Sequence, residues 1–177
     1  NLKNEGFNSQ KIFFVGNTMI DSLLIHKSTI TKNKSILKKL KLPKKKYVIV
    51  TLHRPSNVSS FEKLQFLIDK ITLWNENIKI IWPLHPRVNL DCIKMNDQWK
   101  ILKPLSYIDF ISLIKFSKGI FTDSGGIQEE TSFLGIPCFT LRDNTERPIT
   151  LKKGTNILVA ERFLHKKNIW KYKNKNN

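Results

Sequence analysis

The sequence predicts an α/β fold in which helices cover both faces of a parallel sheet. Two observations predict this class. Segments with strand character alternate along the chain with segments of helical periodicity, which is the order expected when helices connect parallel strands. The strand segments are also continuous apolar runs, which are typical of strands buried on both faces. With 177 residues, the chain is long enough for one domain with a sizeable core.

The N-terminal region predicts a strand, a turn and a helix. The apolar run at residues 11–15 favours a strand, and Gly16 and Asn17 follow it as a turn. Apolar residues then recur at helical spacing over 18–30, and Asn17 is a suitable N-cap for that helix. The lysine-rich segment that follows, up to Pro43, is expected to be a weak helix or an exposed connection.

The central region predicts three strands and two helices. Residues 47–52 and 78–84 are apolar runs that favour buried strands. The helix expected between them, at 60–74, carries its apolar residues on one face. After the second strand, residues 87–95 favour a short helix and residues 100–102 a short strand.

The C-terminal part continues the alternation. Helices and strands are expected in turn at residues 106–116, 119–122, 126–134, 137–141, 146–152 and 156–159. Phe110 is expected on the inward face of the first of these helices. We therefore expect one domain over residues 1–160, followed by a frayed Lys/Asn-rich tail over residues 161–177.

The composition excludes several classes of protein. Hydrophobic residues make up 40% of the chain, which is too many for global disorder. No apolar run reaches the roughly 18 residues of a membrane span, and the N-terminus lacks the pattern of a signal peptide. The first residue, Asn1, indicates a processed chain or a piece of a longer one. Cys92 and Cys138 lie far apart without a CxxC motif, so we expect no metal site, two buried thiols and a reducing, cytoplasmic compartment.

The net charge leaves two interpretations open. Lys and Arg total 31 against 14 acidic residues, which gives a formal charge of +17. Only five of the 31 are Arg, the residue that nucleic-acid-binding proteins favour for bidentate contacts. The lysines, densest at residues 32–46 and near the C-terminus, form either solvated surfaces or an attraction for a phosphate-bearing partner. No recognised nucleic-acid-binding motif accompanies them, and we expect no nucleic-acid partner.

Polar residues gather where the predicted strands end. In parallel α/β sheets, ligands bind at the carboxyl ends of the strands, so we expect these side chains to share one edge. In the order of their strands, they are His53 and Arg54, His85, Asp123 to Gly126, and Arg142 and Asp143.

The Gly-rich turn is the most informative of these groups, because it opens a helix. Gly125 and Gly126 allow the backbone to approach a ligand, and the free N–H groups at the helix start suit a phosphate. The Ser124 hydroxyl can cap the helix or donate to the same anion, although an ordinary capped turn is an alternative. One turn further on, one of the acids Glu129 and Glu130 could accept hydrogen bonds from both hydroxyls of a ribose, or both could be surface acids that stabilise the helix dipole.

Three further side chains each allow two interpretations. His53 is either a satisfied histidine at the sheet edge or a donor to phosphate. His85 lies between two prolines and is more consistent with a structural role. Arg147 could face an anion, or it could pair with Glu146 or Asp143.

Six segments in chain order resemble one family. They are residues 16–21 (GNTMID), 51–58 (TLHRPSNV), 104–110 (PLSYIDF), 122–130 (TDSGGIQEE), 134–137 (LGIP) and 142–148 (RDNTERP). These segments resemble the C-terminal half of the non-hydrolysing UDP-N-acetylglucosamine 2-epimerases, from residue 1 to about residue 160. The DSGGIQEE and TERP segments are the most specific of the six.

The resemblance implies a fold and an activity. The fold is the two-domain glycosyltransferase-B architecture, of which this chain would be one Rossmann-like half, with the active site in the cleft between the halves. The activity is interconversion of UDP-GlcNAc and UDP-ManNAc without a cofactor, by elimination of UDP to a 2-acetamidoglucal and re-addition on the other face. A homodimer and a place in cell-surface polysaccharide biosynthesis are implied as well.

The resemblance also implies roles for individual residues. His53 and Arg147 would be the catalytic cations that face the pyrophosphate, where they stabilise the departing charge. The residues expected to bind UDP are Ser124, Gly125 and Gly126 at the phosphates, Glu130 at the ribose and Phe110 beside the uracil.

The sequence also departs from the family pattern. The family's catalytic carboxylates and a lysine lie in an N-terminal half that this sequence does not contain, and Ser56 stands where many members have Glu. We therefore expect a UDP-binding half-site that is inactive alone and needs the other half, in the same or another chain. Two alternatives stay open: a UDP-binding regulatory domain without turnover, and a hydrolysing UDP-GlcNAc 2-epimerase, although that group typically lacks the TERP segment.

Overall fold

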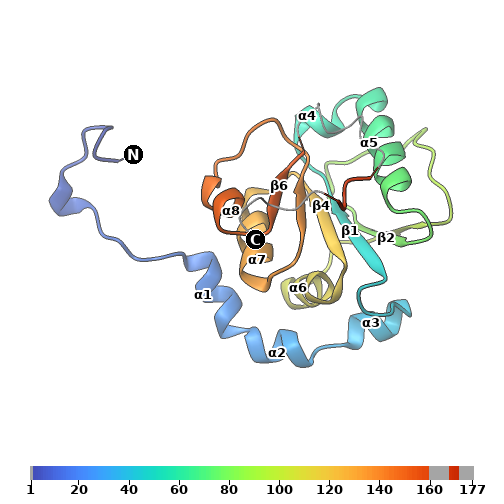
Figure 1. Cartoon of the computed structure of the whole chain (residues 1–177), viewed down its shortest axis with the longest axis horizontal. Coiled ribbons are helices and arrows are strands. Elements are labelled where there is room, and N and C mark those ends of the chain that lie inside the picture. Colours follow the sequence, from blue (N-terminus) through green and yellow to red (C-terminus); the bar gives the residue numbers. More distant parts are fainter. Residues whose placement is uncertain (1, 160–167, 172–177) are drawn as a thin grey trace.

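The computed structural model describes residues 2–159 and 168–171. A parallel sheet forms its centre, helices lie on both sides of the sheet, and an N-terminal arm extends away from it (Figure 1). The predicted fold class is confirmed.

Six short strands build the sheet: β1 (Tyr47–Thr51), β2 (Lys79–Pro83), β3 (Trp99–Leu102), β4 (Gly119–Thr122), β5 (Cys138–Thr140) and β6 (Asn156–Leu158). Their order across the sheet is β3-β2-β1-β4-β5-β6, and every neighbouring pair is parallel. Val48 of β1 lies opposite Ile80 of β2 on one side and Gly119 of β4 on the other. The order reverses between β1 and β4, and ligands of such sheets bind at the carboxyl end of this switch point.

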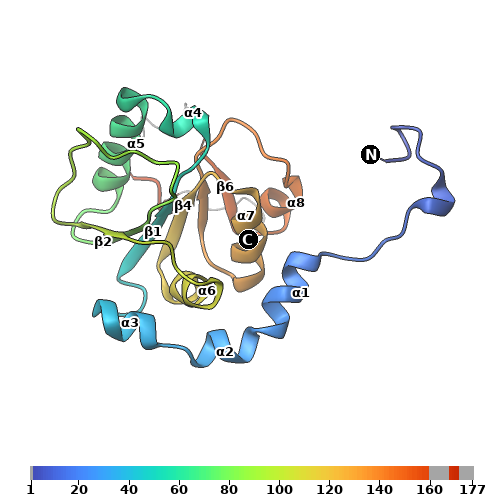
Figure 2. The same ribbon diagram turned by 180° about the vertical axis from the view of Figure 1, so that it is seen from behind.

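The helices form two layers around the sheet (Figures 1 and 2). They are η1 (Ser9–Lys11), α1 (Thr18–Ile25), α2 (Lys27–Lys32), α3 (Ser35–Leu40), α4 (Pro55–Val58), α5 (Phe61–Trp74), α6 (Tyr107–Phe116), α7 (Gly125–Leu134) and α8 (Pro148–Lys152). α5 packs on one face of the sheet, and α6 and α7 pack on the other, so each face has its own apolar core. α1, α2 and α3 lie along the outer side of α6 and α7.

α5 forms as the sequence predicts. The Ser60 hydroxyl accepts a hydrogen bond from the backbone N–H of Lys63 at 3.3 Å and caps the helix start. Each fully buried aliphatic side chain contributes about 1.5–3 kcal/mol relative to an exposed one. Those of α5 recur at helical spacing and pack on the sheet: Leu64, Leu67, Ile68 and Ile71.

The N-terminal arm differs from the prediction. The apolar run at residues 11–15 is not a strand, and Phe13 and Phe14 are 77% and 100% exposed. A strand needs a neighbouring strand to pair with its backbone, and the described part of the chain offers none at this position. Asn17 does cap the next helix, but the helix expected over residues 18–30 breaks at His26 into α1 and α2.

The segment at residues 87–95 also differs from the prediction, because it contains turns and no helix. The Asn89 side chain accepts the backbone N–H of Asp91 at 2.8 Å, and Cys92 has a φ of +66°, so the backbone cannot continue as a helix. Cys92 is exposed, contrary to the prediction, whereas Cys138 is buried in β5.

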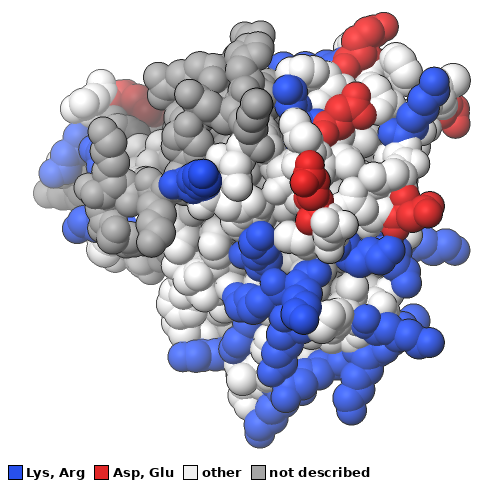
Figure 3. Space-filling model, turned by 45° about the vertical axis from the view of Figure 1, so that its right-hand side comes forward, with Lys and Arg blue, Asp and Glu red and all other residues white. Residues whose placement is uncertain are grey.

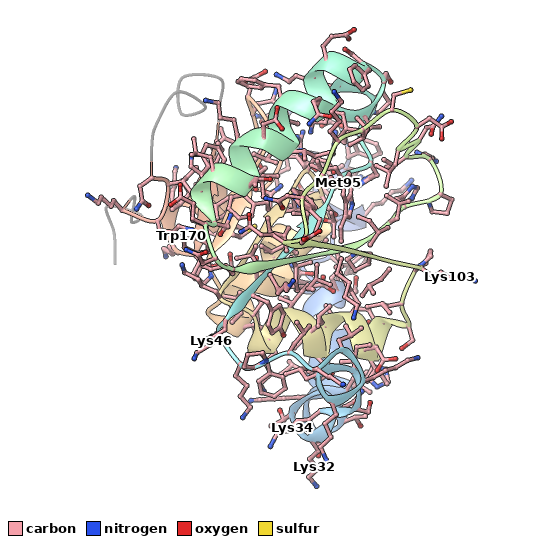
Figure 4. All side chains as sticks on the ribbon, turned by 90° about the vertical axis from the view of Figure 1, so that its right-hand side faces the viewer. Lys32, Lys34, Lys46, Met95, Lys103 and Trp170 are labelled. Atoms are coloured by element: carbon pink, nitrogen blue, oxygen red, sulfur yellow. The ribbon has the colours of Figure 1, made fainter. Side chains whose placement is uncertain are left out.

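A short part of the expected tail is packed against the domain. Ile169 is fully buried, and the Trp170 ring lies edge-on against Phe121 and Phe139. The Trp170 indole N–H donates to the backbone oxygen of Trp74, at the end of α5, at 3.1 Å (Figure 4). Residues 168–171 are therefore anchored, and the remainder of the expected tail lies outside the described residues.

Lysine side chains concentrate at the amino ends of the strands. Basic side chains gather on one face in Figure 3, and Lys32, Lys34 and Lys46 lie at that end of the molecule in Figure 4. Lys46 directly precedes β1, and Lys118 directly precedes β4. The carboxyl ends of the same strands, where a ligand is expected, lie at the opposite edge of the sheet.

Candidate nucleotide-binding site

A buried carboxylate joins the ends of β1 and β4. Asp123, directly after β4, is fully buried. Its side chain accepts hydrogen bonds from the backbone N–H groups of His53 at 3.0 Å and Arg54 at 2.9 Å, and from the Asn57 side-chain amide at 3.1 Å. The Asp123 carboxylate therefore fixes the loop that follows β1, because it satisfies three donors of that loop at once.

The same carboxylate orients the His53 ring. His53 Nδ1 lies 2.9 Å from the Asp123 carboxylate, and the His53 side chain is 32% exposed. The His53 ring packs beside the His85 ring, with 5.3 Å between ring centroids, and the His85 Nδ1 accepts the backbone N–H of Arg87. His85 therefore lies in the site, although its sequence context favours a structural role.

A cavity of about 270 Å³ opens between the ends of β1, β2 and β4. It brings together three of the predicted site residues, His53, Phe110 and Ser124, and adds His85. The rest of its lining is largely apolar, with prolines and leucines from the loops after β2 and β3. An apolar cavity with a few convergent polar groups is the usual form of a small-molecule site, and its size suits a flat ring such as a nucleobase.

The start of α7 lies beside this cavity. Ser124 occupies the N-cap position, but its hydroxyl makes no capping hydrogen bond, so it can donate to a ligand. Gly125 is buried, and a side chain added there would collide with the carboxylate of Glu146. A side chain added at Gly126 would meet the Met19 methyl group of α1 at 2.5 Å. Both glycines therefore leave room for the end of a neighbouring side chain at the helix start.

Two guanidinium groups converge above Gly125. Arg54 lies 3.2 Å from one Glu146 carboxylate oxygen, and Arg142 lies 2.5 Å from the other. A further hydrogen bond fixes the Arg54 side chain, because its Nε donates to the backbone oxygen of Asp123 at 3.1 Å. Two fixed cations and a helix start provide strong stabilisation for an anion at this point.

Glu130 is the buried acid of α7, only 6% exposed. Burial raises its pKa above the usual range and the charge of Glu129 adds to the increase, whereas a hydrogen bond from Tyr107 opposes it. Burial, together with the Glu130 charge and hydrogen bond, raises the pKa of Tyr107 to about 12. Tyr107 therefore stays a hydrogen-bond donor at neutral pH and holds the Glu130 carboxylate in place.

Arg147 has a different partner from the two considered from sequence. Its Nε lies 3.5 Å from a carboxylate oxygen of Glu129, whereas Glu146 pairs with Arg54 and Arg142. Arg147 does not line the cavity that contains His53. The residue after it, Pro148, begins α8, as the sequence predicts.

In the described part of the chain, no group of three or more His, Cys, Asp or Glu side chains could hold a metal ion. Within residues 2–159 and 168–171, no helix is both long and apolar enough to cross a membrane.

Comparison with known proteins identifies the family. The family model described as UDP-N-acetylglucosamine 2-epimerase matches residues 1–173. The chain belongs to this family. The resemblance of its six sequence segments is therefore confirmed.

Two archaeal relatives illustrate the match. The chain is 45% identical to a UDP-N-acetylglucosamine 2-epimerase homolog of Methanococcus maripaludis, over 90% of this chain and 46% of the relative. It is 38% identical to the UDP-N-acetylglucosamine 2-epimerase of Methanocaldococcus jannaschii, over 97% of this chain and 53% of that protein. The chain thus spans about half the length of the curated relatives that it matches.

A solved structure extends the comparison to the fold. The chain resembles the crystal structure of the M. jannaschii UDP-GlcNAc 2-epimerase in complex with UDP-GlcNAc and UDP, with a TM-score of 0.80. The match covers 93% of this chain and 51% of the other, at 38% identity. The chain is therefore a Rossmann-like half of the glycosyltransferase-B type, as the sequence predicts. The ligand roles of its individual residues remain predictions.

Proposed function

We propose that this chain is the UDP-binding half of a non-hydrolysing UDP-GlcNAc 2-epimerase that produces UDP-ManNAc and is inactive without its other half. The observation that carries the proposal is the convergence of Arg54 and Arg142 on the start of α7, beside a cavity that contains His53 and Phe110. An anion site next to a ring-sized apolar cavity matches a uridine diphosphate. The similar M. jannaschii structure is in complex with UDP-GlcNAc and UDP, which supports the same ligand here.

The proposed mechanism gives this half the task of stabilising the leaving group. Elimination of UDP places negative charge on the pyrophosphate, and fixed cations and N–H dipoles stabilise such charge without reorganisation. The Ser124 hydroxyl and the backbone of Gly125 and Gly126 would hold the phosphates. A protonated His53 would donate from Nε2, because Asp123 already holds Nδ1.

Glu130 and Phe110 would hold the nucleoside. The Glu130 carboxylate, fixed by Tyr107, would accept hydrogen bonds from the ribose hydroxyls, and the half-buried Phe110 ring would lie by the uracil. Arg147 is paired with Glu129 and does not line the cavity, so it would need to exchange this partner before it could contact the pyrophosphate.

The acid–base groups for C2 of the sugar would come from elsewhere. The C2 proton is not acidic, so its transfer needs a positioned base and acid. The described acids around the site already have partners: Asp123 binds backbone N–H groups, Glu130 binds Tyr107, and Glu146 binds two arginines. We therefore propose that a second half, in the same or another chain, supplies the acid and base.

Other features complete the proposal as the resemblance implies them. The complete enzyme would act in the cytoplasm as a homodimer and supply UDP-ManNAc for cell-surface polysaccharides. A hydrolysing epimerase is the closest alternative, and it would release free ManNAc in place of the UDP-sugar. A regulatory UDP-binding domain without turnover is the other.

Calorimetry with UDP tests the binding part of the proposal. The chain should bind UDP, and Glu130→Ala and Gly125→Val should weaken that binding at least tenfold. Glu76→Ala is the matched control, because Glu76 is an exposed acid in the turn after α5, at the other end of the sheet. Equal affinities for all four proteins would refute a UDP site at α7.

Reconstitution tests the catalytic part. The chain alone should not convert UDP-GlcNAc, and addition or fusion of an N-terminal half from a relative should restore formation of UDP-ManNAc, followed by NMR. His53→Ala in the restored enzyme should lower kcat about 10²–10³-fold, as loss of one donor to a developing anion does. Turnover by the chain alone would refute the half-site, and release of free ManNAc would favour the hydrolysing alternative.

A further inference from the structure

A carboxylate occupies the place proposed for the pyrophosphate. The Glu146 side chain lies so close to Gly125 that a single added carbon there would collide with it. Gly125 is the first residue of α7, where free N–H groups favour an anion. A carboxylate and a pyrophosphate cannot share this position, because their negative charges repel each other.

Glu146 also takes up the two cations of the site. One of its oxygens pairs with Arg54 and the other with Arg142, so one carboxylate is shared by both guanidinium groups. Arg54 is fixed independently through its Nε and the backbone oxygen of Asp123, so it does not depend on Glu146 for its position. The Glu146 side chain is 43% exposed, which leaves it free to rotate into solvent.

We propose that Glu146 is an internal substitute for the pyrophosphate: it occupies the anion site in the ligand-free protein and is displaced when a nucleoside diphosphate binds. The inference rests on the proposed function, because it assumes that the anion at α7 is the pyrophosphate of UDP. The carboxylate keeps the two arginines paired beside the helix start until the ligand replaces both ion pairs together. Binding of UDP therefore includes the loss of two ion pairs.

Replacement of the Glu146 carboxylate by a pyrophosphate makes the site selective for phosphorylated ligands. A pyrophosphate can replace the carboxylate at both arginines and at the helix start. Uridine has no phosphate, so it can bind only through its base and ribose and leaves Glu146 in place. The effect of removing the Glu146 charge should therefore appear with UDP and be absent with uridine.

The test compares Glu146→Gln with the parent and with Asp143→Asn. Glutamine keeps the size of the side chain and removes its charge. Asp143 is an exposed acid three residues earlier in the same loop, without a described ion pair, so Asp143→Asn removes the same charge without releasing either arginine. Calorimetry would measure UDP and uridine with all three proteins, and thermal melting would measure each without ligand.

The expected result follows from the ion pairs that the ligand no longer has to break. Two partly exposed ion pairs correspond to a factor of roughly 2–30 in an equilibrium constant. Glu146→Gln should therefore bind UDP about 2- to 30-fold more tightly than the parent, whereas Asp143→Asn should stay within about twofold. Uridine affinity should be the same for all three proteins to within about twofold.

Other results separate the inference from the proposed function. If the parent binds UDP and Glu146→Gln binds it equally or more weakly, Glu146 supports the arginines for the ligand, and the inference is refuted while the UDP site stands. A lower melting temperature without tighter UDP binding also refutes it, because that is the signature of a structural ion pair. If none of the three proteins binds UDP, the proposed function fails and the inference fails with it.

Discussion

Removal of the Asp123 carboxylate should be the most damaging single change at the candidate site. In Asp123→Ala, the backbone N–H groups of His53 and Arg54 and the side-chain amide of Asn57 lose their acceptor. The His53 ring also loses the carboxylate that lies 2.9 Å from its Nδ1. The variant leaves these donors in place and removes only what satisfies them, so its cost reports on the carboxylate alone.

The magnitude follows from the number and burial of the donors. A buried donor without a partner costs about 1–3 kcal/mol, so three donors would cost at most about 9 kcal/mol. His53 and Arg54 are only partly buried, and water can reach their side of the loop, which favours the lower part of this range. We therefore expect a loss of about 3–5 kcal/mol, which lowers the melting temperature by roughly 6–20 °C in a domain of this size.

Urea unfolding and thermal melting would measure the loss. Asp143→Ala is the control, because it removes an exposed acid at the end of the neighbouring strand β5 and should change stability by no more than about 0.5 kcal/mol. Asp123→Asn retains one acceptor oxygen and should fall between the parent and Asp123→Ala. A loss below about 1 kcal/mol for Asp123→Ala would show that the loop after β1 does not depend on this carboxylate.

Three other variants test separate parts of the structure. The pKa of Glu130 is higher in the folded than in the unfolded protein, so the stability that its protonated form contributes at acidic pH is lost as the pH rises through the folded pKa. Glu130→Gln should therefore raise the melting temperature at neutral pH, yet weaken UDP binding about 10- to 100-fold. A lower melting temperature at neutral pH would contradict this. Gly135 ends α7 with a φ of +68°, and no atom lies within 4 Å of a side chain added there. Gly135→Ala should therefore lower the free energy of unfolding by about 1 kcal/mol through backbone strain. An unchanged free energy of unfolding in urea would exclude that strain. The third variant replaces Lys38, Lys39, Lys44 and Lys45 by Gln. UDP affinity should stay within about twofold at physiological salt, because charges beyond about 8 Å are screened. A tenfold loss in calorimetry would place these lysines at the site.

The sheet could be predicted because its strands are continuous apolar runs in the sequence. A continuous apolar run such as that of β1 is stable only when both of its faces are covered, and all its neighbours in this fold come from the same chain. The run at residues 11–15 has the same local pattern but no strand beside it in the described structure. Local pattern indicates what a segment can form, and pairing decides what it does form.

The helix expected at residues 87–95 failed for a local reason. Apolar residues recur in this segment, and several of them do pack against the core on the α5 side. The Asn89 side chain, however, takes the backbone N–H of Asp91, and Cys92 adopts a left-handed conformation. Competition between a short polar side chain and the helical hydrogen bond decided the outcome, and the Asn–Leu–Asp order was the signal that could have indicated it.

The edge of the sheet that contains the site was predictable, but the pairing of its side chains was not. Polar residues after β1, β2, β4 and β5 had to meet, because carboxyl ends of parallel strands share one edge. The sequence could not show that His85 lies beside His53, since that depends on the angle of two loops. The sequence also could not show that Glu146 pairs with Arg54, which is 92 residues away, or that Arg147 pairs with Glu129.

The division of cations between the two ends of the sheet explains why the net charge says little about function. The chain has only five arginines, and three of them, Arg54, Arg142 and Arg147, pair with acids at or near the start of α7. A planar guanidinium can hold two oxygens of a carboxylate or phosphate in fixed geometry, which a flexible ammonium group cannot. Lysines instead concentrate at the amino ends of the strands, at the other end of the sheet from the site. The formal charge of +17 therefore describes mainly the lysine surface, and a few arginines that pair with Glu146 and Glu129 define the anion site.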